Sequence, residues 1–177
     1  MDRKKFIKAS GIGLGAILLP RIGKSAIAAE NSTKTLQSTS KIIKDSDGEI
    51  LNVIGDIQTH KLSGGDTENQ VVEWVDNVKP GVGIHSKEDE IFRVVKGKVE
   101  IMVGGKTTVL NEGDTAYAPK NVPHSWKVVG TENAKMITSA FPGGIEYMFR
   151  ELAALPEGPP NVEEVAKICL AHGISFV

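Results

Sequence analysis

The feature that most restricts the fold of this 177-residue chain is a series of short apolar or alternating runs separated by turn-forming residues. Gly104-Gly105, between two such runs, is a two-residue hairpin signal. Strands this short and this closely spaced predict an antiparallel sandwich or barrel. The runs are Ile50–Ile54, Ile57–Leu62, Gln70–Val75, Ile91–Val95, Val99–Val103, Lys106–Leu110, Thr115–Ala118, Ser125–Val129 and Ala134–Ser139.

Two short helices are expected after the strands. Ile145–Leu152 is amphipathic, and Asn161 is a good N-cap for a second helix over Val162–Ala171, with Gly173 just past its end. We therefore expect a β-domain over residues 46–144 and a helical tail over residues 145–177.

The N-terminus has the composition of an export signal. Basic residues 3–8 precede an apolar stretch of about eleven residues, which is too short for a membrane-spanning helix of roughly 20. Ala26 and Ala28 then supply the small residues of a cleavage site. We predict a signal peptide over residues 1–28 and a polar linker over 29–45. The alternatives are a first helix of the fold itself and an uncleaved membrane anchor.

Residues Arg3 to Lys8 resemble a twin-arginine signal, with Lys4 in place of the second arginine. General secretion is the alternative route. Cleavage would remove six basic residues and one acidic residue, leaving 15 basic and 21 acidic residues and a net charge of -6. We expect a periplasmic or secreted acidic protein that has no membrane span in its mature form and binds no nucleic acid. The single Cys169 excludes an intramolecular disulfide and a cysteine-rich zinc site.

Potential metal ligands occur in two clusters rich in turn residues. His85 and Glu90 lie in the first cluster and His124 in the second, and both histidines are expected at strand edges. Neutral imidazoles together with a carboxylate suit a divalent transition metal such as Fe, Mn, Ni, Zn or Cu.

The same residues resemble the two motifs of the cupin superfamily. The first motif consists of His, four residues, Glu, six residues and Gly, and it is matched by His85, Glu90 and Gly97. The second consists of Gly, five residues, Pro, four residues and His, and it is matched by Gly113, Pro119 and His124. The sequence around Glu90 is similar to that of the quercetin-dioxygenase-like cupins. The resemblance implies an all-β, single-domain cupin barrel of jelly-roll type with short C-terminal helices.

The chain also departs from the cupin pattern. Most metal-binding cupins have a further histidine where this chain has Gly83, and Asn121 replaces the glycine of the second motif. Asn121 can adopt the left-handed turn at modest cost. The resemblance therefore implies three metal ligands, His85, Glu90 and His124, with Glu90 also able to transfer a proton.

Strand alternation suggests which residues line the cavity. Phe92 shares a face with Glu90, and Trp126 shares one with His124. Both are candidates for a hydrophobic pocket wall, as are Met102 and Tyr117, and ordinary barrel core is the alternative. His60 lies among polar residues and is expected to be exposed, with a ligating role only if its strand passes the barrel mouth.

Two function classes follow. The resemblance implies a metal-dependent, dioxygenase-like oxidoreductase acting on a small aromatic or enolic compound. The alternative is a non-catalytic periplasmic cupin that binds a small molecule or sugar at a degenerate metal site. A homodimer is compatible with either class.

Overall fold

The structure is a computed structural model that describes residues 40–76, 81–85, 87–156 and 158–176, with only the backbone described for 81–85. Its strands are β1 (Glu49–Val53), β2 (Asp56–Leu62), β3 (Val72–Asp76), β4 (Gly81–His85), β5 (Asp89–Lys96), β6 (Val99–Val103), β7 (Lys106–Leu110), β8 (Thr115–Ala118), β9 (His124–Val128), β10 (Lys135–Phe141) and β11 (Ile174–Ser175). The helices are α2 (Ile145–Ala153) and α3 (Val162–Ala171).

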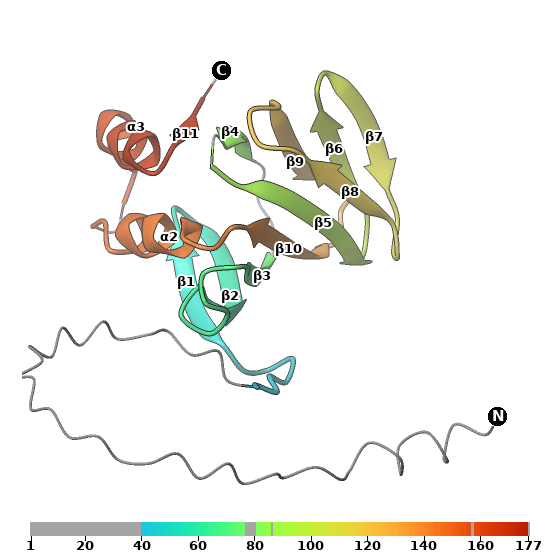
Figure 1. Ribbon diagram of the computed structural model, residues 1–177. Coiled ribbons are helices and arrows are strands. Elements are labelled where there is room, and N and C mark those ends of the chain that lie inside the picture. Colours follow the sequence, from blue (N-terminus) through green and yellow to red (C-terminus); the bar gives the residue numbers. More distant parts are fainter. Residues whose placement is uncertain (1–39, 77–80, 86, 157, 177) are drawn as a thin grey trace, which may run out of the picture. The chain divides into compact units, whose positions relative to one another are not determined.

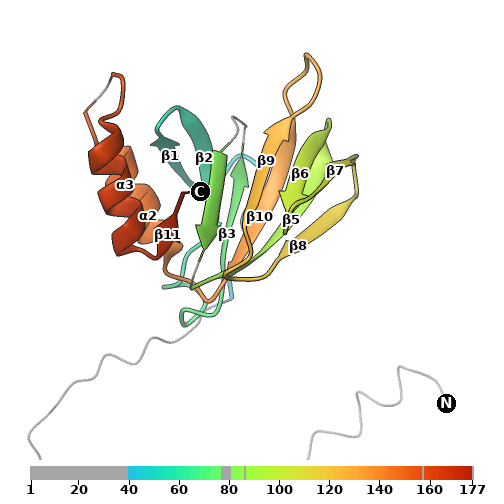
Figure 2. The same cartoon turned by 90° about the horizontal axis from the view of Figure 1, so that it is seen from above.

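The strands form two antiparallel sheets. One has the order β1-β2-β3-β10-β5-β8 and the other the order β11-β4-β9-β6-β7. Figures 1 and 2 show the two helices beside β1 and β11, and the β6-β7 hairpin at the opposite end of the sheets. Consecutive hairpins such as β6-β7 are combined with pairs that are far apart in sequence, as in β3-β10 and β4-β9, which is the connectivity of a jelly roll. The predicted all-β fold is confirmed.

Two turns adopt the backbone that their residues favour. Gly104 and Gly105 have φ values of 58° and 79°, the paired left-handed conformation of a tight hairpin between β6 and β7. Asn121 has φ 64°, so this asparagine takes the left-handed turn expected of it before β9.

Two apolar clusters cover different parts of the inner face of the six-stranded sheet. Between the sheets, Phe92 and Val94 of β5 pack with Val99 and Ile101 of β6. At the β1-β2-β3 end, residues of β3 instead pack against α2, where the Trp74 and Phe149 rings lie 5.0 Å apart. The inner face is therefore closed by the second sheet on one side and by α2 on the other.

Most elements lie where the sequence predicts them. The two helices are confirmed, and the Asn161 side chain accepts hydrogen bonds from the amides of Glu163 and Glu164. The sequence analysis missed β4 and β11. β4 carries only Val82 and Ile84 as apolar residues between glycines, and β11 is two residues long.

The N-terminal predictions lie outside the described residues. The signal peptide over residues 1–28 and most of the linker over 29–45 belong to this part of the chain. Within the part that the structure does describe, no helix has the length and apolar character needed to cross a membrane.

Candidate functional site

Glu90 is held on the inner face of β5 between two small neighbours. It pairs with Ala140 of β10 on one side and with Ala118 of β8 on the other. Residues directly opposite each other in antiparallel strands project from the same face. Both alanines are fully buried, so their short side chains leave space above the sheet for the carboxyl group of Glu90.

His124, the first residue of β9, meets Glu90 from the other sheet. Its Nε2 lies 2.8 Å from Glu90 Oε2, and both side chains are at least 96% buried. The other ring nitrogen, Nδ1, lies 2.9 Å from the carbonyl oxygen of Val122. Because a carbonyl only accepts, Nδ1 is the protonated nitrogen, and Nε2 is left to face the carboxyl group.

Two opposing effects act on the pKa of His124. Burial lowers it, whereas the hydrogen bond and the negative charge of Glu90 raise it, and the net direction is upward. Glu90 therefore favours the protonated form of the His124 ring.

The backbone brings His85 towards the same region. In the β4-β9 ladder Gly83 is paired with His124, so His85 lies two positions along β4 from the partner of His124. It pairs with Ile174 of β11 on its other side. The side chain of His85 lies outside the described part of the structure.

Comparison with known proteins gives a family match for the central part of the chain. Residues 75–140, which contain β4, β5, β9 and all three predicted ligands, match the cupin domain family. An uncharacterized protein of Aquifex aeolicus is 26% identical over 96 residues, which are 54% of this chain and 75% of the relative.

Solved structures share the fold at low sequence identity. KdgF from a Halomonas species is 19% identical, with a TM-score of 0.52 over 62% of this chain and 99% of its own. A protein described as a predicted oxalate decarboxylase, from Thermotoga maritima, is 18% identical, with a TM-score of 0.52 over 58% of this chain and 99% of its own. An RmlC-like cupin from Shewanella frigidimarina is 18% identical, with a TM-score of 0.50 over 63% of this chain and 98% of its own.

The described donors, Glu90 and His124, are compatible with a metal ion. Two ligands about 2.1 Å from an ion lie about 3.0 Å apart at a right angle and about 3.4 Å apart in a tetrahedron. Nε2 of His124 and the Glu90 carboxyl group, 2.8 Å apart, would need only a small shift to reach the first of these separations. Within residues 40–76, 87–156 and 158–176, no group of three His, Cys, Asp or Glu side chains has the arrangement of a metal site. A third protein ligand must therefore come from outside this set, and His85 is the residue that the cupin motif assigns.

The candidate wall residues divide between the two faces of their strands. Phe92 is 1% exposed, and its ring centre lies 5.7 Å from that of His124. Trp126 packs against the same apolar cluster. Tyr117 instead pairs with Ile91, on the face opposite Glu90, and is 55% exposed. Met102 pairs with Ser125 rather than with His124, so it also lies on the other face of its sheet.

The expectation that His60 is exposed is wrong. It is 5% exposed, and its ring stacks on Trp74 at 5.9 Å and meets the edge of Phe149 at 5.5 Å. His60, Trp74, Thr138 and Phe92 occupy one row across four strands. Three strand spacings separate His60 from β5, about 14 Å, so His60 is too far away to bind the same ion as Glu90.

Sequence reasoning missed two buried acids. Glu88 is 4% exposed, and burial, together with the nearby charge of Glu90, raises the pKa of Glu88 to about 7. Asp76 is 1% exposed and accepts hydrogen bonds from Trp74 Nε1 at 2.8 Å and Thr138 Oγ1 at 2.7 Å. Burial, and then the charge of Asp56, raise the pKa of Asp76 well above its ordinary value. The only sequence feature that could have indicated burial of Glu88 and Asp76 is their position at the edge of an apolar run.

Proposed function

We propose that the cupin domain holds a divalent transition metal through His85, Glu90 and His124. The observation that carries the proposal is the approach of His124 Nε2 to Glu90 at 2.8 Å between two sheets, with both side chains buried. Buried charged groups persist in proteins mainly where they are paired or bind metals. Iron, manganese, nickel and zinc all accept this ligand set.

The surrounding residues would prepare the two described ligands. The carbonyl of Val122 fixes the tautomer of His124 and orients its ring, as outer partners of metal-bound histidines commonly do. The bound ion would supply Lewis-acid or oxygen chemistry to a substrate oxygen. Glu90 is able to take up or release a proton at its carboxyl group, and Phe92 beside it excludes water.

We further propose that the protein acts as a dioxygenase-like oxidoreductase on a small aromatic or enolic compound. The buried ring of Phe92 beside His124, and the partly buried Trp126 that packs against the same apolar cluster, favour a flat, largely apolar substrate. The resemblance of the Glu90 segment to quercetin-dioxygenase-like cupins supports the same class. We also propose that the N-terminal segment directs export and that two copies associate.

One observation favours a non-catalytic alternative. Gly83, opposite His124 in the β4-β9 ladder, occupies the place where most metal-binding cupins have a further histidine. A site with one ligand fewer holds metal less firmly, and such a cupin would bind a small molecule or sugar without turnover.

Metal content of the purified full-length protein tests the proposal. We expect close to one equivalent of a transition metal in the wild type and little in His85→Ala, Glu90→Gln or His124→Ala. His172→Ala is the matched control, because His172 pairs with Glu151 at the end of α3. Less than about 0.2 equivalents of every metal after anaerobic reloading would overturn the metal site.

Turnover separates the two function classes. The metal-loaded protein would be screened for oxygen uptake with catechols, flavonols and diketones. Uptake that disappears in Glu90→Gln supports the enzyme. Saturable binding of these compounds without uptake supports the binding protein instead. Export is tested separately with a reporter fused after residue 45: a fusion that stays in the cytoplasm would contradict it.

A further inference from the structure

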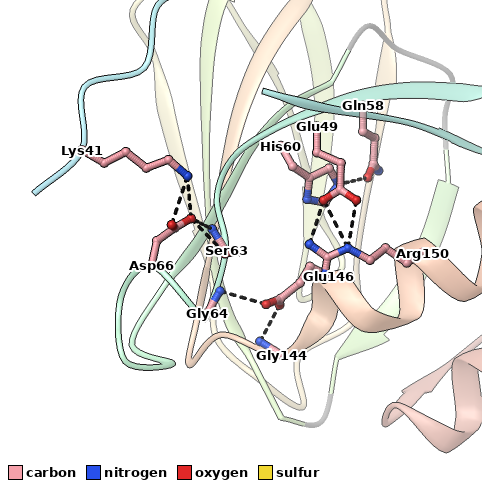
Figure 3. Close-up of polar contacts among 10 residues, drawn as sticks. All are labelled: Lys41, Glu49, Gln58, His60, Ser63, Gly64, Asp66, Gly144, Glu146 and Arg150. Carbon is pink, nitrogen blue, oxygen red and sulfur yellow. Dashed lines mark hydrogen bonds and ion pairs between the residues drawn. The ribbon is translucent and has the colours of Figure 1, made fainter. Parts of the chain in front are cut away.

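A cavity lies at the other end of the six-stranded sheet from Glu90. It has a volume of about 420 Å³, which is within the range of small-molecule sites. It is lined by residues 41–43 and 47–49, the end of β2 and the loop after it, and Arg150 of α2. Figure 3 shows the polar residues of this region. We name this cavity the β2 pocket. It shares no lining residue with the His124–Glu90 site.

The charged side chains of the β2 pocket already have partners. Lys41 Nζ lies 3.0 Å from both carboxylate oxygens of Asp66. Arg150 binds Glu49 through Nε and a terminal nitrogen, at 2.7 to 3.1 Å. Lys61 Nζ donates to three backbone carbonyls of residues 44, 45 and 47. The lining contains three cationic and three acidic side chains, so a charged ligand would lack a counter-charge.

One wall residue carries a buried acceptor without a donor. Gln58 Nε2 donates to Asp56, which turns Oε1 of Gln58 towards His60, and His60 Nε2 donates to that oxygen at 3.0 Å. Burial lowers the pKa of His60 to about 4, so the ring is neutral and Nδ1 is an acceptor. Nδ1 is buried and has no hydrogen-bond partner among the described residues. A missing partner at such an atom costs about 1–3 kcal/mol.

The rest of the lining adds an apolar contact. Ile42 is 97% exposed although it forms part of the β2 pocket, and Leu62 lies on the same cavity. A ligand with carbon-bound hydrogens on one side would cover Ile42. The ring of His60 cannot turn away from such a ligand, because Trp74 and Phe149 hold it on two sides.

We propose that the β2 pocket binds a small uncharged polyhydroxy compound, of the size of a monosaccharide or cyclic polyol, with one hydroxyl donating to His60 Nδ1. Hydroxyl groups both donate and accept, so neighbouring hydroxyls can satisfy Glu49 and Arg150 without breaking their pairing. The apolar side of the ligand would lie against Ile42. This site is separate from the proposed metal site and needs no metal ion.

The proposal is tested by NMR titration of the full-length protein with named probes. D-glucose, D-galactose, L-rhamnose and myo-inositol are the neutral probes, and gluconate and glucosamine are the charged comparators. We expect at least one neutral probe to bind saturably, with a Kd below about 5 mM. The ¹⁵N resonance of His60 Nδ1 should move towards the value of a hydrogen-bonded acceptor during the titration.

Variants locate the binding. His60→Phe keeps an aromatic ring between Trp74 and Phe149 but removes the acceptor, and should weaken binding about tenfold. His60→Asn restores an acceptor near the position of Nδ1 and should bind within about threefold of the wild type. If His60→Phe fails to fold, Ile42→Glu replaces it, because an exposed residue leaves the core intact. We expect about fivefold weaker binding from lost apolar contact.

The outcomes are distinct from those of the metal experiments. Binding that persists in EDTA and in Glu90→Gln supports a separate site even if the protein holds no metal. Failure of all four neutral probes to saturate overturns the proposal and leaves Nδ1 to a bound water. Binding of gluconate or glucosamine that is tighter than that of every neutral probe overturns the ligand class. Wild-type affinity in both His60→Phe and Ile42→Glu overturns the location.

Discussion

Acid should destabilise this protein through His60 in a way that can be measured. The ring is 5% exposed, and burial is the largest effect on its pKa, followed by the charge of Glu49, which acts in the opposite direction. The pKa of His60 is about 4 in the folded protein, against an ordinary value of 6.5. Below pH 6.5 the unfolded chain takes up a proton that the folded protein refuses, so stability is lost as the pH falls.

The size of this loss follows from the two pKa values. Each pKa unit corresponds to about 1.4 kcal/mol, so His60 alone removes about 2 kcal/mol between pH 7 and pH 5 and about 3 kcal/mol by pH 4. Carboxyl groups contribute in the same range, so the contribution of His60 must be isolated by comparison. His60→Asn lacks the titrating ring, and its stability deficit relative to the wild type should shrink by about 2 kcal/mol from pH 7 to pH 5.

The measurement is the free energy of unfolding in urea at pH 7, 6 and 5, for the wild type, His60→Asn and a control variant. Val99→Ala is the matched control: Val99 is fully buried in the other cluster and cannot titrate, so its deficit should not change with pH. A His60→Asn deficit that stays constant within about 0.5 kcal/mol would show that His60 is not held neutral by burial, and the reasoning would fail.

Two further predictions concern buried carboxyl groups and use urea unfolding. Asp76→Asn should be more stable than the wild type at pH 8, with a gain that shrinks towards pH 4, because burial raises the pKa of Asp76 and an amide still pairs with Trp74 and Thr138. A gain over the wild type that is larger at pH 4 than at pH 8 would contradict this. Glu146→Ala should lose about 2–5 kcal/mol, because the buried carboxylate accepts two glycine amides at 2.8 Å. Exposed Glu151→Ala is its control, and equal losses would count against the explanation.

Much of the fold was predictable because its strands alternate. β5 lies where the sequence places it, since its buried residues alternate with more exposed ones. β6, β7 and β8 are also where the sequence places them, because glycine-containing turns separate them. β4 was not predicted because glycines interrupt it. Its position is set by pairing with β9 and not by its own composition. Local patterns report local structure, whereas this strand depends on a partner about 40 residues away.

The candidate site, too, was predicted only in part from the sequence. Motif spacing singled out Glu90 and His124, which are 34 residues apart and meet at 2.8 Å. His60 was misjudged because its neighbours along β2 are polar, and sequence alternation equates a polar run with exposure. The inner face here is itself partly polar: Gln58, His60, Asp76 and Thr138 are all buried. His60 bonds to Gln58 within β2, and Thr138 of β10 donates to Asp76 of β3. Such pairing depends on register, which a single sequence does not specify.

One row of residues crosses the inner face of the six-stranded sheet between the two proposed sites. His60 and Phe92 belong to one row, with Trp74 and Thr138 between them, and both of these residues are hydrogen-bonded to Asp76. Three strand spacings, about 14 Å, separate the ends of this row. Groups so far apart with no shared partner usually act additively. The two carboxylate oxygens of Asp76 accept from Trp74 and Thr138 and so join the two middle residues of this row. We therefore expect substitutions at His60 and at Phe92 to have additive effects on the free energy of unfolding.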